Sequence, residues 1–141
     1  MRRNEPMSGK NVRVAIMTLP ALLLSVAEAR SAGIQVARPL PGYTCEQLDL
    51  TEEQARDITL QVIAREAPSR LAPIVGYVSM TVAVRTPEHR VNGFVEALWP
   101  TGRTVWIPAD VLQPYHSLSE PATRCVPAVM TSGNIGFDYK R

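Results

Sequence analysis

Two short apolar segments separated by a tight turn constrain the fold of this chain more than any other feature of its sequence. Residues 94–99 read FVEALW and residues 104–107 read TVWI, and the four residues between them, PTGR, include a proline and a glycine. Segments rich in β-branched and aromatic side chains that lie this close together pair as an antiparallel hairpin. Gly102 can adopt the positive φ that such a turn requires, and Pro108 ends the second strand. The sequence therefore predicts a β-hairpin over residues 94–107.

Apolar residues on either side of this hairpin alternate in the manner of half-buried strands. Residues 77–85, YVSMTVAVR, alternate strictly, and Asn92-Gly93 is a turn signal directly before the hairpin. After the hairpin, residues 108–112, PADVL, predict a short turn of 3₁₀ type. We expect a small barrel with a core of six β-branched and small side chains, which are Val82, Val84, Val95, Ala97, Val105 and Ile107.

One α-helix is predicted ahead of the β-rich segment, over residues 51–67. Thr51 and Gln54 have the spacing of a capping box, which satisfies backbone donors at a helix start. The apolar residues that follow recur at spacings of three and four, which gives one buried stripe, and Pro68 ends the pattern. Residues 34–50 contain two prolines and a glycine near their start and are predicted to form an extended leader without a core of its own.

Residues 1–33 have the charge order of a signal peptide. Residues 1–13 are basic, and residues 14–27 are an uncharged apolar run that is too short to span a bilayer as a helix. The pattern AEA follows at residues 27–29, so we expect residues 1–33 to be a signal peptide that is cleaved near residues 29–33. The product would be periplasmic or secreted, with no transmembrane segment in the mature chain. An amphipathic or buried N-terminal helix is the alternative.

The two cysteines of the chain, Cys45 and Cys125, are expected to form a disulfide, because export leads to an oxidising compartment. The bond would close a loop of about 80 residues, which the chain-entropy model values at about 4 kcal/mol. It would tether residues 116–141, which are predicted to be a polar linker followed by a C-terminal tail. No lipidation motif of small residues precedes Cys45, so lipid anchoring is not expected.

Charge and histidine spacing exclude two classes of function. Residues 34–141 contain ten Lys and Arg against eleven Asp and Glu, and the arginines form no stripe that would follow a phosphate backbone. A nucleic-acid partner is therefore not expected. His89 and His116 lie in separate polar segments without metal-binding spacing, so both are predicted to be surface residues and no metal is expected.

Candidates for catalysis are few. Cys45 has histidines downstream, as a cysteine peptidase requires, but a disulfide would remove its nucleophilic thiolate. Glu52 and Glu53 are adjacent and point to different helix faces, and Glu96 is predicted to be solvated. We therefore expect no catalytic residue and no cofactor, and a small hydrolase is kept as the minor alternative.

The hairpin and the residues after it resemble the distal half of a bacterial SH3-like domain of the SH3b type. That family has a strand, a DGRTGW-like hairpin, a Val-Pro pair and a short helical turn in this order. Here residues 101–104, TGRT, Trp106, Ile107-Pro108 and residues 109–112, ADVL, correspond to these parts. The resemblance implies an SH3-like barrel over residues 70–115. The fold class expected for the chain is mainly β, with a small SH3-like barrel preceded by one α-helix and followed by a disulfide-tethered tail.

The resemblance also implies a binding surface, since SH3-type domains bind extended peptides in an aromatic groove beside the proline-containing turn. The residues that could form such a groove here are Trp99, Trp106, Pro108 and Tyr115. Two alternatives stay open, because Trp106 could be purely structural and Tyr115 could pack under the C-terminal tail.

Together these features predict a non-catalytic exported binding domain. It would be a small accessory or assembly subunit of a larger periplasmic or membrane-associated complex, with a protein partner in the cell envelope. The alternative is an SH3-like module that binds peptidoglycan stem peptides, a cell-wall ligand, or an extended protein peptide.

Overall fold

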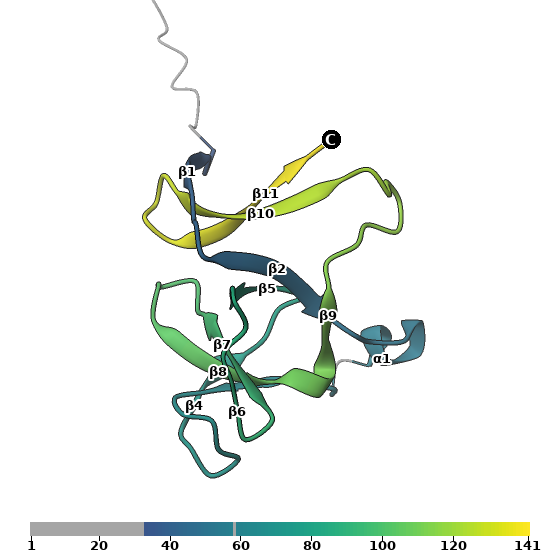
Figure 1. The fold of residues 1–141 in the computed structure, drawn as a ribbon. Helices are drawn as coiled ribbons and strands as arrows, with labels where there is room; N and C mark the ends of the chain where they lie inside the picture. The colour runs from purple at the N-terminus through teal and green to yellow at the C-terminus, as the bar shows by residue number, and fades with distance from the viewer. Residues whose placement is uncertain (1–32, 58) are drawn as a thin grey trace, which may run out of the picture. The chain divides into compact units, whose positions relative to one another are not determined.

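The computed structural model describes residues 33–57 and 59–141 of the chain. The predicted signal peptide and its cleavage site lie outside this part, apart from Gly33 at its border. The described residues are mainly β, as predicted, and they form two antiparallel sheets (Figure 1). Among them no helix has both the length and the apolar character needed to cross a membrane.

The larger sheet has eight strands, and seven of them follow the order β4-β3-β8-β7-β5-β2-β9, while β6 pairs with β7. Their bounds are β2 (Tyr43–Leu48), β3 (Ile63–Arg65), β4 (Ile74–Tyr77), β5 (Thr81–Arg85), β6 (Arg90–Val91), β7 (Phe94–Leu98), β8 (Thr104–Pro108) and β9 (Leu112–Pro114). The terminal strands β4 and β9 do not pair with each other, so this sheet is not closed into a barrel.

The core of the larger sheet is the predicted one. All six predicted side chains are buried and form one cluster, which Ala64 of β3 joins. On the predicted hairpin, Val95 lies opposite Ile107 and Ala97 lies opposite Val105, and each of these four residues is at most 1% exposed. Complete burial of a Val or Ile side chain stabilises a fold by about 1.5–3 kcal/mol, so this cluster carries much of the stability of the sheet.

The predicted turns are also confirmed. The strands β7 and β8 form the hairpin, and Gly102 has a φ of 85° in the turn between them. Asn92 and Gly93, with φ values of 50° and 79°, connect β6 to β7, as expected for a turn that requires two residues with positive φ. A 3₁₀ helix, η1 (Ala109–Val111), follows β8 directly.

The predicted helix over residues 51–67 is wrong in its length. The capping box is present, with Gln54 N donating to Thr51 Oγ1 at 3.2 Å and Thr51 N donating to Gln54 Oε1 at 2.9 Å, but α1 (Glu52–Arg56) ends after five residues. The carboxylate of Asp57 accepts bonds from Thr59 N at 2.8 Å and Thr59 Oγ1 at 2.6 Å, a local turn that competes with helix continuation. All five side chains of α1 are exposed. Ile63, which the pattern assigned to the buried stripe, begins β3 instead, and the next residue of that strand, Ala64, is fully buried although it was not part of the stripe.

The leader predicted over residues 34–50 is also corrected, since it supplies two strands. The strand β1 (Val36–Pro39) belongs to the smaller sheet, and β2 pairs with both β5 and β9 in the larger one. The larger sheet therefore begins well before residue 70, the predicted start of the barrel. The predicted strand over residues 77–85 is interrupted, because β4 ends at Tyr77 and β5 begins at Thr81.

The smaller sheet has the order β1-β10-β11 and contains most of the predicted tail. The strands β10 (Arg124–Met130) and β11 (Ile135–Lys140) form a hairpin around the predicted turn at residues 132–134, where Gly133 has a φ of 85°. The predicted disulfide is present and joins Cys45 of β2 to Cys125 of β10, with 5.9 Å between the two Cα atoms. Figure 1 shows the β10–β11 hairpin beside β2, so the disulfide ties the smaller sheet to the larger one.

Candidate functional site

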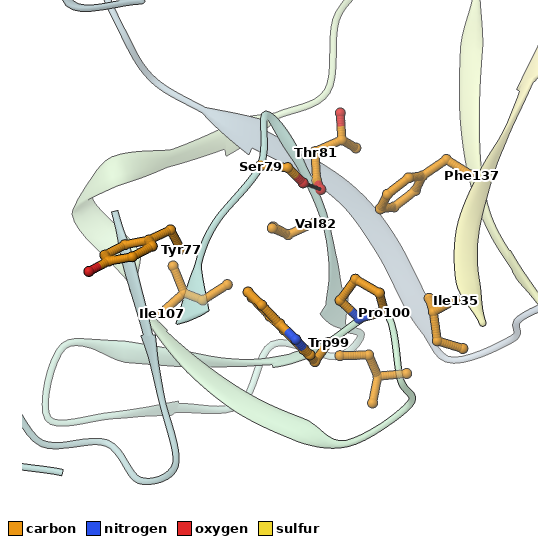
Figure 2. A pocket seen from close by; sticks show the side chains of 10 residues that line it. Tyr77, Ser79, Thr81, Val82, Trp99, Pro100, Ile107, Ile135 and Phe137 are labelled. Atoms are coloured by element: carbon orange, nitrogen blue, oxygen red, sulfur yellow. Dashed lines mark hydrogen bonds between the residues drawn. The ribbon is translucent and has the colours of Figure 1, made fainter. Parts of the chain in front are cut away.

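An apolar pocket of about 180 Å³ lies between the larger sheet and the C-terminal hairpin (Figure 2). Its walls come from β4 and β5, from the β7–β8 hairpin and from β11. The lining residues are Tyr77, Ser79, Thr81, Val82, Leu98, Trp99, Pro100, Ile107, Ile135 and Phe137. We call this recess the Trp99 pocket.

Trp99 has a fixed place in this pocket. Its backbone N–H donates to Arg103 O at 2.9 Å, which places the indole at the start of the hairpin turn. The ring lies so close to β4 that a Cβ added to Gly76 would be 2.6 Å from Trp99 Cζ2. The absence of a side chain at Gly76 therefore makes room for the indole. Figure 2 shows the indole in the middle of the pocket, between Ile107 and Pro100.

The C-terminal hairpin closes the opposite wall. Ile135 N donates to Pro100 O at 2.7 Å, which ties the first residue of β11 to the hairpin turn of the larger sheet. Phe137 follows two residues later in the same strand and lines the pocket on the same side as Ile135. One wall of the pocket therefore depends on the position of a hairpin that the disulfide tethers.

The chemistry of the pocket suits apolar binding. Tyr77, Ser79 and Thr81 carry the only side-chain hydroxyls among its ten lining residues, and none of the ten carries a carboxylate, an imidazole or an amine. Ser79 Oγ donates to Thr81 O at 3.4 Å, as the dashed line in Figure 2 marks. A nucleophile paired with a base, which covalent catalysis requires, is not found among these residues. The pocket can hold an aliphatic or aromatic group through packing.

The edge strand β4 borders the pocket and is the second element of the site. It pairs with β3 and with no other strand of the described residues. Val78 N donates to Val62 O at 2.8 Å, so the preceding residue, Tyr77, directs its own N–H and C=O away from β3. The side chains of Ile74 and Tyr77 are 53% and 55% exposed. An open backbone edge with apolar side chains is a surface to which an extended peptide can add as a further strand.

The four predicted binding residues do not line a common pocket. Trp99 lies in the pocket described above, and Pro108 borders a different groove, beside Arg70 and Phe94. Trp106 packs edge-on against His89, with 5.3 Å between the ring centroids.

Tyr115 packs against the C-terminal hairpin. Its ring centroid lies 5.5 Å from that of Tyr139, which in turn lies 6.5 Å from that of Phe137. This contact is the alternative that the sequence left open for Tyr115, so its ring belongs to the packing between the two sheets.

Trp106 lies beside a charged cluster that the sequence did not predict. The carboxylate of Glu96, on the neighbouring strand, contacts His89 Nδ1 at 2.6 Å and accepts a bond from an Arg85 guanidinium nitrogen at 2.9 Å. The side chain of Glu96 is 12% exposed, so the expectation that it is solvated is wrong. The hydrogen bond with His89 lowers the pKa of the Glu96 carboxyl below its ordinary value; burial opposes this effect and the Arg85 guanidinium adds to it. His89 is half exposed, as a surface histidine.

Cys45 and His116 are two further residues to consider for catalysis or metal binding. Cys45 has no free thiol, because it is disulfide-bonded. In residues 33–57 and 59–141, no three His, Cys, Asp or Glu side chains gather as a metal site would require. His116 is exposed and contacts Gln47 Nε2 through its Nδ1 at 3.2 Å.

Sequence reasoning identified only part of the pocket. Ile135 and Phe137 are recognisable in the sequence as apolar residues of the tail, but nothing in it places them opposite Trp99. Gly76 and Tyr77 carry no sequence signal for their roles either. No protein-family model matches the chain, and neither a curated protein nor a solved structure is similar enough to match it.

Proposed function

We propose that this chain is a non-catalytic, exported binding domain that serves as an accessory or assembly subunit of a larger periplasmic or membrane-associated complex. The observation that carries the proposal is the Trp99 pocket next to the open edge of β4. The partner is an envelope protein that presents an extended segment. That segment adds to β4 through its backbone and places one apolar side chain in the pocket.

The two contacts have different functions. Burial of one aliphatic side chain contributes about 1.5–3 kcal/mol, and each backbone hydrogen bond to the edge contributes about 0.5–1.5 kcal/mol. The hydrogen bonds require an extended backbone but no particular sequence, whereas the volume of about 180 Å³ limits the size of the side chain. Because ordering of the bound segment costs free energy, these contacts alone give weak binding. The proposed partner therefore needs additional contacts, as a subunit of an assembly has.

Export and the SH3-like relationship are part of the same proposal. The disulfide supports export, because such bonds persist in oxidising compartments. The succession of hairpin, 3₁₀ helix and short strand, over β7, β8, η1 and β9, supports an SH3-like origin of the larger sheet.

The test is affinity purification of the tagged protein from its native envelope in mild detergent, with mass spectrometry of the proteins recovered. Tyr77→Glu places a charge at the pocket mouth and on the edge strand. Leu118→Glu is the control, because Leu118 is also an exposed apolar residue and does not line the pocket. Both variants should keep the fold, which circular dichroism checks.

We expect one protein at stoichiometric amount with the wild type and with Leu118→Glu, and its loss with Tyr77→Glu. Equal recovery with all three proteins would exclude the Trp99 pocket as the binding site. If the wild type instead sediments with cell wall and no protein accompanies it, the accessory-subunit proposal is wrong and the alternative, binding of peptidoglycan stem peptides, takes its place.

A further inference from the structure

A second groove lies on a different part of the larger sheet from the Trp99 pocket. Two recesses of about 270 and 370 Å³ adjoin here, because they share the lining residues Arg70, Phe94, Pro108 and Asp110. None of these four residues lines the Trp99 pocket. We call the two recesses together the Arg70 groove.

The floor of the Arg70 groove is apolar. Phe94 begins β7 and is 6% exposed, and Pro108 lies directly opposite it at the end of β8. Val111 of the 3₁₀ helix and Ile63 of β3 extend the floor at one end of the groove. An apolar side chain of a ligand can therefore be buried here.

The rim carries more positive than negative charge. Arg65, Arg70 and Arg90 border the groove, and Asp110 is the acidic residue among its lining. Arg90 Nε is 2.6 Å from a carboxylate oxygen of Glu88, and Arg65 donates to Ala72 O at 2.7 Å, so both guanidinium groups have partners.

Arg70 differs from these two arginines. It forms no ion pair within residues 33–57 and 59–141, and in particular none with Asp110 on the same groove. Its guanidinium group is thus available to a ligand. This local surplus of positive charge contrasts with residues 34–141 as a whole, where eleven acidic residues outnumber ten basic ones.

These properties together specify the ligand. An apolar floor beside an unpaired guanidinium group is complementary to a carboxylate joined to an apolar group, and Arg binds carboxylates in a planar, two-point geometry. The side-chain amides of Gln61 and Asn92 lie along the groove. Asn92 Nδ2 donates to Pro68 O at 3.3 Å, which leaves the Asn92 carbonyl oxygen and the Gln61 amide to pair with the amide groups of a chain. A peptide C-terminus provides all three features, whereas a small inorganic anion would leave the floor uncovered.

We propose that the Arg70 groove binds the C-terminus of an extended peptide, with the terminal carboxylate on Arg70 and the last apolar side chain on Phe94 and Pro108. This site is separate from the Trp99 pocket, and the inference does not depend on the proposed function of that pocket. The proposal makes Pro108 a binding residue of the Arg70 groove, which neither Trp99 nor Trp106 lines.

The test uses the full mature chain labelled with ¹⁵N and two synthetic peptides, N-acetyl-Gly-Ala-Val-Leu with a free carboxylate and the same sequence as the C-terminal amide. Arg70→Gln removes the proposed partner of the carboxylate. Arg38→Gln is the matched control, because Arg38 is also exposed and forms no ion pair with another described residue, but it lies on β1 and does not line the groove. Arg70 is an exposed loop residue, so both variants should give the wild-type amide spectrum without peptide.

We expect saturable shifts at Gly93 and Val111 with the acid peptide. The wild type should bind the amide peptide with about tenfold lower affinity than the acid peptide, and Arg70→Gln should bind the acid peptide with about tenfold lower affinity than the wild type does. Both losses are the effect of one charge-assisted contact. Arg38→Gln should bind like the wild type.

The proposal is overturned by equal affinity for acid and amide, by unchanged binding to Arg70→Gln, or by no saturation at millimolar peptide. Shifts confined to Gly76 and Thr81 would overturn it too, because they would place the peptide in the Trp99 pocket. Preferential binding of decanoate over the acid peptide would identify a lipid site instead.

Discussion

A single methyl group added to Gly76 should destabilise the protein, because the indole of Trp99 occupies the space where that methyl would lie. The new Cβ would be 2.6 Å from Trp99 Cζ2 and 3.0 Å from Trp99 Cη2. Real Cβ atoms have no neighbours at the shorter of these distances, so either the ring or β4 must move. The ring is held between Ile107, which is 1% exposed, and a hairpin turn fixed by backbone hydrogen bonds.

The magnitude follows from two opposing terms. Overpacking of a well-filled site costs about 1–3 kcal/mol. Replacement of glycine by alanine reduces the entropy of the unfolded chain, which returns about 0.4–1 kcal/mol where the native backbone accepts alanine, and Gly76 has no positive φ. The net loss expected for Gly76→Ala is therefore about 1–2 kcal/mol.

Gly136→Ala is the control, because its added Cβ is equally close to a neighbour, 2.7 Å from Met130 Cγ, but that neighbour is a flexible side chain. A methionine can change rotamer at low cost, so the entropic term should dominate and stability should stay within about 0.5 kcal/mol of the wild type. Urea unfolding followed by tryptophan fluorescence and by far-UV circular dichroism measures both variants. If Gly76→Ala is as stable as Gly136→Ala, the indole is not held against β4 and the description of the Trp99 pocket is wrong.

Three further outcomes are expected. Replacement of Cys45 and Cys125 together by serine should lower the free energy of unfolding by about 4.5 kcal/mol, from the chain entropy of a loop with a sequence separation of 80. Labelling of free thiols in the wild-type protein, unfolded without a reductant, would contradict the disulfide. Glu96→Gln should reduce the loss of unfolding free energy that the wild type shows at acid pH. The native pKa of Glu96 is depressed, so the stability that its ionised form contributes is fully present above the ordinary pKa of 4.5 and is lost as pH falls through the lower native pKa. An unchanged loss at acid pH, measured by urea unfolding at graded pH, would refute this. Thr51→Ala should change the free energy of global unfolding by less than about 0.5 kcal/mol, because the capped helix α1 buries no side chain, and a loss above about 1 kcal/mol would show that α1 supports the core.

The parts of the fold that were predictable are those whose signals are local. The β7–β8 hairpin needs only two nearby strands and Gly102 with positive φ, and alternation along each strand then determines which side chains enter the core. The capping box at Thr51 and the turn at Gly133 are local in the same sense, and both are present. The disulfide was predictable because the chain has only two cysteines, which permit one pairing, and its N-terminal sequence has the charge order of a signal peptide.

The helix prediction failed because a periodic apolar pattern does not distinguish residues buried on one face of a helix from residues buried in a short strand. Val62 and Ile63 belong to the predicted helical stripe, but both are β-branched and suit a short strand equally well. In the fold, pairing of β3 with β4 and β8 buries Ala64 completely. Tertiary pairing therefore outweighs the local pattern, and only the capped first turn remains helical.

The site was less predictable than the fold, since its walls come from segments that are distant in the sequence. Trp99 was recognised from its hairpin. Tyr77 meets it only through the order β4-β3-β8-β7 in the larger sheet, and Phe137 meets it only because the C-terminal hairpin lies against that sheet. The groove expected from SH3-like proteins requires several aromatic residues on one surface, and here Trp106 and Tyr115 pack elsewhere. Resemblance over one hairpin could not reveal this, because strands outside that hairpin determine which aromatic residues stay accessible.

The disulfide between the two sheets affects the proposed binding site, because it holds the C-terminal hairpin that forms one wall of the Trp99 pocket. Phe137 and Ile135 line the Trp99 pocket only while the C-terminal hairpin stays in place, and Cys125 is the covalent anchor of that hairpin. A backbone bond from Ile135 N to Pro100 O adds a second tie, but a single such bond contributes about 0.5–1.5 kcal/mol. The Arg70 groove, by contrast, is lined entirely by residues of the larger sheet and its connections. The wall that Ile135 and Phe137 give to the Trp99 pocket therefore depends on the Cys45–Cys125 disulfide, whereas no residue of the C-terminal hairpin lines the Arg70 groove.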